Sequence, residues 1–186
     1  MRVMVTGHRP PKIGGYRTPN PTEQWVRTML HKILEGMLRK DPKLVAVSGM
    51  ALGADTIFVE ECLALGIPFI AAVPFEEQDN RWPGESQKHY RDLLTKAKKV
   101  VYVDQVASYH SDHFAGKMNE RNRWMVEHSE QAIAVWDGTK GGTGNTVNLL
   151  QYKERKVLRL NPSTFETSVM EPEPDEDLVG EMFGGD

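Results

Sequence analysis

The sequence predicts a Rossmann-like α/β fold, in which a mainly parallel central sheet lies between two layers of helices. Short β-branched runs alternate with longer segments of helical period about five times, which is typical of a parallel sheet covered by helices. These runs look buried on both faces. The 186 residues suffice for one domain with its own core. Right-handed crossovers make a doubly wound three-layer sandwich the expected topology.

The strands are predicted at residues 3–6, 44–48, 68–74, 100–103, 132–136 and 156–160. The most regular helix of the chain lies between the first two. Its apolar side chains recur every four residues, at Trp25, Met29, Ile33 and Met37. Thr22 is expected to cap its start, and Pro42 follows soon after its end. Further helices are expected after the second to fifth strands, at residues 54–65, 84–97, 116–127 and 146–152.

Residues 161–186 are predicted to form an acidic, flexible tail, so that the folded domain spans residues 1–160. The tail carries eight acidic residues and no lysine or arginine. Residues 171–177 are too polar and too charged to bury. The alternative is that the apolar end of the tail docks on the body or on a partner, through Leu178, Val179, Met182 and Phe183. A loose terminus is the preferred interpretation.

Hydrophobic residues make up 39% of the chain and charged residues 26%, which excludes the fibrous and disordered classes. Cys62 is the only cysteine, so no internal disulfide forms and a reducing compartment fits best. No segment has the pattern of a signal peptide or a membrane span, and a cytoplasmic location is expected. The tail holds eight of the 26 acidic residues, which leaves 18 against 23 bases in the body, or about +5. This charge suits a phosphate-bearing ligand, although a solvated mixed surface explains it equally well.

Ligands of open parallel sheets bind beyond the carboxyl ends of the strands, so the residues that follow each strand are the candidate site. Gly7, His8 and Arg9 follow the first strand. Gly7 lets the backbone approach a ligand, and the two basic side chains can meet an anion. A tight turn with exposed basic residues is the alternative, but the loop that continues to Pro21 is long for a connector.

Two glycine-containing loops run directly from a strand into a helix, where free N–H groups and the helix dipole favour phosphate. The loop after the second strand is not a P-loop, because the lysine and hydroxyl of that motif are missing, and it is not a dinucleotide fingerprint, because its spacing differs. In the loop after the second strand, Asp55 either contacts the ligand or caps the helix. The candidate residues of this loop are Ser48, Gly49, Met50, Gly53, Ala54 and Asp55. Those of the loop after the fifth strand are Asp137, Gly141, Gly142, Thr143, Gly144, Asn145 and Thr146.

The helix before the fifth strand supplies a fourth group, Glu120, Arg121 and Asn122. Arg121 can form a bidentate contact to phosphate, and Glu120 can hold a ribose hydroxyl or act as an acid or base. Surface salt bridges explain these charges equally well.

Two weaker patterns favour solvated loops over sites. The first, Asp104, His110, Asp112 and His113, has no fixed metal-ligand spacing. The second, which includes Trp82, follows the third strand and has the residues to stack on a base. The sequence therefore indicates no metal and no separate cofactor.

At these same residues the sequence resembles the SLOG superfamily, which joins the lonely-guy, DNA-processing A and YpsA-like proteins. The matching segments are residues 5–9, 48–55 and 121–126 together with Gly141, Gly142 and Thr143, and they are most similar to the YpsA-like branch. The resemblance implies a Rossmann-like fold, a homo-oligomer, and a pocket for a nucleotide or a ligand derived from one.

The enzymatic lonely-guy branch cleaves the N-glycosidic bond of nucleoside monophosphates with two motifs. Met118 and Arg121 fit its Met-x-x-Arg motif. This sequence keeps only part of the second motif, the glycine loop. Lys140 replaces its proline, Asn145 its threonine and Asn148 its catalytic glutamate. An amide takes up no proton, so Glu120 with Arg121 would have to supply the catalysis.

The leading hypothesis is therefore binding or sensing of a nucleotide-type ligand. Nucleotide N-glycosidic cleavage is the second. DNA binding is third and is not expected, because Lys96, Lys98 and Lys99 form the only basic cluster.

Overall fold

The computed structural model describes residues 1–104 and 114–172, with side chains from Gly116 onward in the second segment. In this part of the chain, strands form one sheet in the order β4-β3-β2-β1-β5-β6-β7. Their bounds are β1 Arg2–Gly7, β2 Val45–Ser48, β3 Phe69–Val73, β4 Lys99–Tyr102, β5 Gln131–Val135, β6 Val157–Asn161 and β7 Glu166–Met170. All neighbouring pairs are parallel except β6 and β7, which are antiparallel. The predicted mainly parallel sheet is confirmed.

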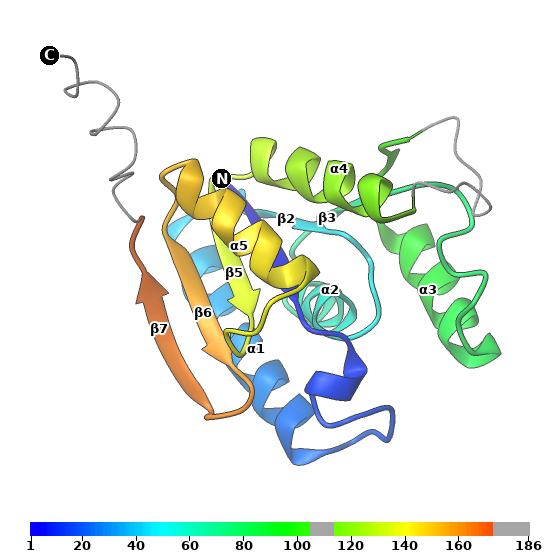
Figure 1. Cartoon of the computed structure of the whole chain (residues 1–186), viewed down its shortest axis with the longest axis horizontal. Helices are drawn as coiled ribbons and strands as arrows, with labels where there is room; N and C mark the ends of the chain where they lie inside the picture. The colour runs from blue at the N-terminus through cyan, green and yellow to red at the C-terminus, as the bar shows by residue number, and fades with distance from the viewer. Residues whose placement is uncertain (105–113, 173–186) are drawn as a thin grey trace, which may run out of the picture.

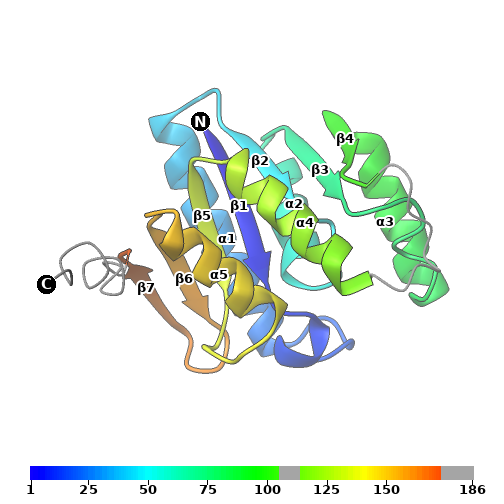
Figure 2. The ribbon, with the colours of Figure 1, turned by 45° about the horizontal axis from the view of Figure 1, so that its top comes forward.

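Helices cover both faces of the sheet, as Figures 1 and 2 show. One face packs against α1 (Pro21–Lys40), α2 (Ala54–Ala64) and α3 (Gly84–Lys96). The other packs against α4 (Phe114–Glu127) and α5 (Gly142–Tyr152). Alternate residues of one strand point to opposite layers, so that Val3 and Val5 join the first cluster and Met4 the second. The three-layer sandwich is thus confirmed. None of the described helices is long and apolar enough to cross a membrane.

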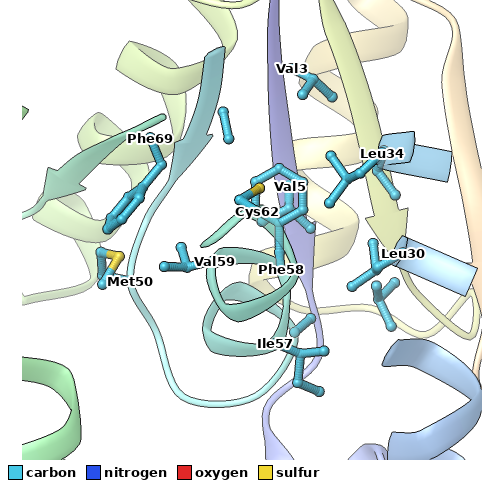
Figure 3. Packing of buried hydrophobic residues seen from close by; sticks show 14 of the residues in the cluster. Val3, Val5, Leu30, Leu34, Met50, Ile57, Phe58, Val59, Cys62 and Phe69 are labelled. Carbon is cyan, nitrogen blue, oxygen red and sulfur yellow. The ribbon is translucent and has the colours of Figure 1, made fainter. Parts of the chain in front are cut away.

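The larger core lies between the sheet and the layer of α1 and α2 (Figure 3). Phe58 and Cys62 of α2 are fully buried against strand residues such as Val5, and Leu30 and Leu34 come in from α1. Full burial of each large apolar side chain contributes about 1.5–3 kcal/mol. Burial also raises the pKa of the Cys62 thiol, which makes it an inert core residue, as its position in the helix predicts.

The observed element boundaries differ from the predicted ones at three places. Asn20 caps α1 in place of Thr22, since its Oδ1 accepts the Glu23 N–H at 2.9 Å. Helix α5 begins at Gly142 and not at Thr146. Glycine has a low helix propensity, but it is tolerated in the first turn, where the backbone N–H groups have no carbonyl partner within the helix. Residues 166–170 were expected in the flexible tail, but they form β7 at the edge of the sheet. Residues 173–186 of the tail lie outside the described residues.

The strand order places a topological switch point at β1. The chain builds β2, β3 and β4 outward on one side of β1 and then returns to lay β5 on its other side. The connections that leave the carboxyl ends of β1 and β5 therefore diverge to opposite faces of the sheet. Such a divergence opens a crevice at the strand ends, where ligands of doubly wound folds bind.

Candidate functional site

A cavity of about 440 Å³ lies at the carboxyl ends of β1 and β5. Its walls come from the loop after β1, the start of α2, one face of α4, and the loop that leads into α5. The residues that line it are Val5, Thr6, Gly7, His8, Arg9, Pro11, Lys12, Ala51, Asp55, Met118, Arg121, Asn122, Met125, Thr139, Lys140, Gly141, Gly142, Thr143 and Gly144. The volume lies within the range of small-molecule sites.

The first turn of α5 opens into this cavity with its backbone donors free. Its N-cap, Gly141, has no side chain to cap the helix. The first N–H of the turn with a backbone acceptor is that of Asn145, which donates to the Gly141 carbonyl at 2.9 Å. Among the described residues, none accepts from the N–H groups of Gly142, Thr143 or Gly144. Three free donors at a helix N-terminus favour an anion.

The junction between β2 and α2 is also a glycine-containing loop that leads from a strand into a helix, but its backbone N–H groups already have acceptors within the protein. The Asp55 carboxylate accepts the backbone N–H groups of Ala51, at 3.2 Å, and of Gly49. The Met50 N–H donates to Ser48 Oγ at 3.1 Å. Asp55 also places a negative charge in the first turn of α2, where the helix dipole favours one. The backbone donors of this junction are therefore already occupied by its own side chains.

Arg121 reaches across the floor of the cavity from α4. Its Nη1 donates to the Gly49 carbonyl, and its Nε donates to Asn122 Oδ1 at 2.8 Å. Any Cβ at position 49 would collide with this guanidinium, so glycine is needed there for a close approach. The Arg121 residue is 6% exposed, as is Asp55.

Arg121 and Asp55 interact through their charges across a buried site without forming a direct ion pair. Burial lowers the pKa of Arg121, and the charge of Asp55 opposes that shift. Burial likewise raises the pKa of Asp55, and the charge of Arg121 opposes it. Each group therefore supports the charged form of the other.

His8, Lys12 and Asp137 form a second charged cluster between the loops that follow β1 and β5. His8 Nε2 lies 2.6 Å from Asp137 Oδ1, and Lys12 Nζ lies 3.2 Å from Asp137 Oδ2. Thr139 donates to the same carboxylate from its backbone N–H, at 3.0 Å, and from its hydroxyl, at 2.6 Å. Desolvation works against ionisation, but these hydrogen bonds together lower the pKa of Asp137 well below its usual range. Asp137 is therefore ionised at neutral pH.

Trp136 and Arg159 support the loop before α5 from behind. The Trp136 indole N–H donates to the Thr139 carbonyl at 2.8 Å, and Arg159 Nε donates to the Trp136 carbonyl at 2.9 Å. The Arg159 guanidinium lies over the indole ring, 5.2 Å from its centroid. The ring also packs close to Gly144. These contacts hold the free donors of α5 in place.

Most of the predicted segments meet at the cavity, although not every predicted residue faces it. Those that line it are Gly7, His8, Arg9, Asp55, Arg121, Asn122, Gly141, Gly142, Thr143 and Gly144. Ser48, Gly49, Met50 and Asp137 lie behind the wall in the hydrogen bonds described above. Gly53 and Ala54 pack against the loop after β1, where the Ala54 N–H donates to the His8 carbonyl at 3.1 Å.

The remaining predicted residues lie on the helices beside the cavity. Thr146 is buried and donates to the Gly142 carbonyl at 2.9 Å, while Asn145 is exposed. Glu120 and Asn148 are also exposed and do not line the cavity, so Asp55 is its only lining carboxylate among the described residues. Of the histidine and aspartate pattern after β4, His110, Asp112 and His113 lie outside the described residues.

Lys12 is the main residue of the site that the sequence did not single out. It belongs to a short 3-10 helix in the loop after β1, Pro10–Lys12, and its amino group reaches both Asp137 and Thr139. The unusual length of this loop is the one sequence feature that pointed to it. Lys140 and Thr139 also line the cavity, from the glycine loop.

A family model described as the YspA SLOG family matches residues 3–166 of the chain. The chain is also similar to an uncharacterized SPbeta prophage-derived protein of Bacillus subtilis, YoqJ. The two sequences are 30% identical over 156 residues, which cover 77% of this chain and 91% of YoqJ.

Two solved structures of DNA processing protein A share the fold. The protein from Streptococcus pneumoniae aligns with a TM-score of 0.61 and 18% identity, over 86% of this chain and 50% of its own. The chain thus spans half the length of that protein. The protein from Helicobacter pylori, which binds single-stranded DNA, aligns with a TM-score of 0.59 and 20% identity, over 98% of this chain and 73% of its own. At this identity the likeness concerns the fold alone.

Proposed function

The chain belongs to the YspA SLOG family, and from this premise we propose that it binds a nucleotide or nucleotide-derived ligand in the cavity at the carboxyl ends of β1 and β5. The phosphate of the ligand binds at the N-terminus of α5. The observation that carries the proposal is the set of three free backbone donors at Gly142, Thr143 and Gly144, which open into the cavity.

The charges around the cavity support an anionic ligand. Arg9 and Lys140 line it, and no ion pair or hydrogen bond engages either side chain within the described part of the chain. Lys12 adds a third positive charge at the rim. The two nearby carboxylates, Asp55 and Asp137, are both held in hydrogen bonds with protein donors. The field that an incoming ligand meets is therefore positive.

The far side of the cavity supports the neutral part of the ligand. The Asn122 amide and the apolar side chains of Met118 and Met125 line it next to Arg121. Such a mixture of apolar wall and few polar groups is typical of pockets that fix a sugar and a base. No carboxylate stands free in the described cavity wall to act on a glycosidic bond, and the geometry favours binding over cleavage.

The cavity supports a small ligand better than a DNA strand. The basic cluster of Lys96, Lys98 and Lys99 lies at the start of the edge strand β4, whereas the cavity lies at the carboxyl ends of the central strands β1 and β5. A strand of DNA needs a continuous basic track. The relationship to DNA processing protein A nevertheless makes an oligonucleotide the natural competitor in any binding experiment.

Calorimetry with a nucleoside and its 5′-monophosphate tests this function. Native mass spectrometry of the freshly purified protein identifies the ligand that the protein carries, and this ligand determines which base is used in the calorimetry. The same measurement gives the oligomeric state, which the family resemblance implies to be a homo-oligomer. The monophosphate should bind roughly ten- to a hundredfold more tightly than the nucleoside, because charge-assisted hydrogen bonds contribute about 1.5–3 kcal/mol. Equal affinities, or much tighter binding of a single-stranded oligonucleotide, would contradict the proposal.

A further inference from the structure

His8 has one ring nitrogen bound to the protein and the other directed to the open side. Its side chain is 8% exposed, and the residue lines the cavity. Nε2 makes the contacts with Asp137, to the carboxylate at 2.6 Å and to the backbone nitrogen at 3.1 Å. Nδ1 has no hydrogen-bond partner among the described residues, and it is not fully buried. The accessible edge of the ring is therefore the one that carries Nδ1.

The contact with Asp137 determines where the ring carries its proton. A carboxylate only accepts hydrogen bonds, so at 2.6 Å the proton must lie on Nε2. The backbone N–H of Asp137 would be satisfied by the other tautomer, but the shorter bond to an ionised group is the stronger of the two. The accessible Nδ1 then carries the lone pair of the ring. A lone pair repels an anion, whereas a second N–H at the same place would bind one.

Burial and the neighbouring charges act in opposite directions on the pKa of His8. Burial lowers the pKa of His8, and the hydrogen bond and charge of Asp137 oppose this shift. Lys12 acts in the same direction as burial. The other charged residues around the cavity are Arg9, Asp55, Arg121 and Lys140. Since burial prevails, the imidazole is neutral near pH 7, and an added negative charge favours its protonation.

We propose that His8 binds the anionic group of the ligand as an imidazolium, so that the pocket takes up one proton together with its anion. Nε2–H stays on Asp137 and the new Nδ1–H donates to the anion. The inference rests on the proposed function, because it requires an anion at the N-terminus of α5. It adds that acid strengthens binding: affinity is highest below the titration range of free His8 and falls as the pH rises through it.

NMR titration of the imidazoles with and without saturating sulfate tests the inference. Sulfate is a suitable probe because its own charge stays constant across the range in which histidine titrates, about pH 5 to 8. The pKa of His8 should rise by about one pH unit when sulfate binds. His31 in α1 and His89 in α3 are matched controls, since each contacts a glutamate, at 2.8 and 2.7 Å, and neither lines the cavity. Their titration curves should not change.

The affinity for sulfate provides the reciprocal measurement. A rise of one pH unit corresponds to roughly tenfold tighter binding at acid than at alkaline pH, because the coupling between proton and anion acts equally in both directions. In His8→Gln, the amide still donates to Asp137 but gains no charge, so the affinity should not depend on pH. Should that variant not fold, the titration of the wild-type imidazole decides alone.

The outcomes separate this inference from the proposed function. Sulfate binding that shifts the amide signals of Gly142 and Gly144 without changing the titration of His8 would overturn only the inference. Amide signals that do not respond to sulfate at any pH would overturn both, because the anion site itself would be absent.

Discussion

Replacing Gly142 with valine is expected to weaken binding of a nucleoside monophosphate by at least about a hundredfold, or about 2.7 kcal/mol, with little loss of stability. Gly142 has no other atom within 4 Å of the position of a Cβ, and its φ lies outside the left-handed region, so the folded chain accepts a side chain there. Gly142 is also one of the residues that line the cavity. A branched side chain would occupy the place of the phosphate.

Gly36→Val is the matched control for this change. Gly36 lies in α1, in the opposite helical layer, and also has open space around its Cβ position. Both variants should unfold close to the wild-type temperature, and calorimetry should find a loss of affinity only at position 142. Unchanged affinity of Gly142→Val would show that the loop before α5 merely connects two elements.

Arg121→Ala is expected to have the largest combined effect on stability and binding. The substitution removes the donor to the Gly49 carbonyl and leaves the buried Asp55 without its compensating charge. A buried acceptor left without its donor costs about 1–3 kcal/mol, and the lost support for the charge of Asp55 adds to this cost. Binding of the monophosphate should also weaken, by roughly ten- to a hundredfold, because the contact of Arg121 with the ligand is lost.

Two variants of the same helix make this prediction specific. Arg121→Lys should recover part of both losses, since a lysine supplies the charge without the planar fork of donors. Arg123 is exposed and does not line the cavity, so Arg123→Ala should change neither property by more than about 0.5 kcal/mol. Urea denaturation and calorimetry measure the two effects separately. A damaging Arg123→Ala beside a harmless Arg121→Ala would mean that α4 presents a different face to the cavity.

The fold could be predicted from the sequence because its strong signals are local. The apolar runs that became β1, β2, β3 and β5 are buried on both faces, which favours apolar residues at successive positions. β7 gives no such signal. It pairs on one side only, and four of its five residues are exposed, so that its composition is that of a polar loop. Only its pairing with β6, a tertiary contact, makes it a strand.

The site could be predicted as a set of loops, but not in its chemistry. Sequence pattern made the loops before α2 and α5 equivalent phosphate candidates. The folded chain distinguishes them, because the Asp55 side chain turns back onto the N–H groups of its own loop and Gly141 leaves those of α5 free. Lys12 could not be assigned, since its partner Asp137 lies 125 residues further along the chain. Contacts of this kind depend on the pairing of β1 with β5.

The central claim is that the phosphate of the ligand binds at the first turn of α5. The most direct test is a crystal structure of the protein grown with a nucleoside monophosphate. The account predicts phosphate oxygens at about 2.7–3.2 Å from the backbone nitrogens of Gly142, Thr143 or Gly144. Density for the phosphate at the start of α2, against Ala51 and Asp55, or outside the cavity altogether, would contradict it.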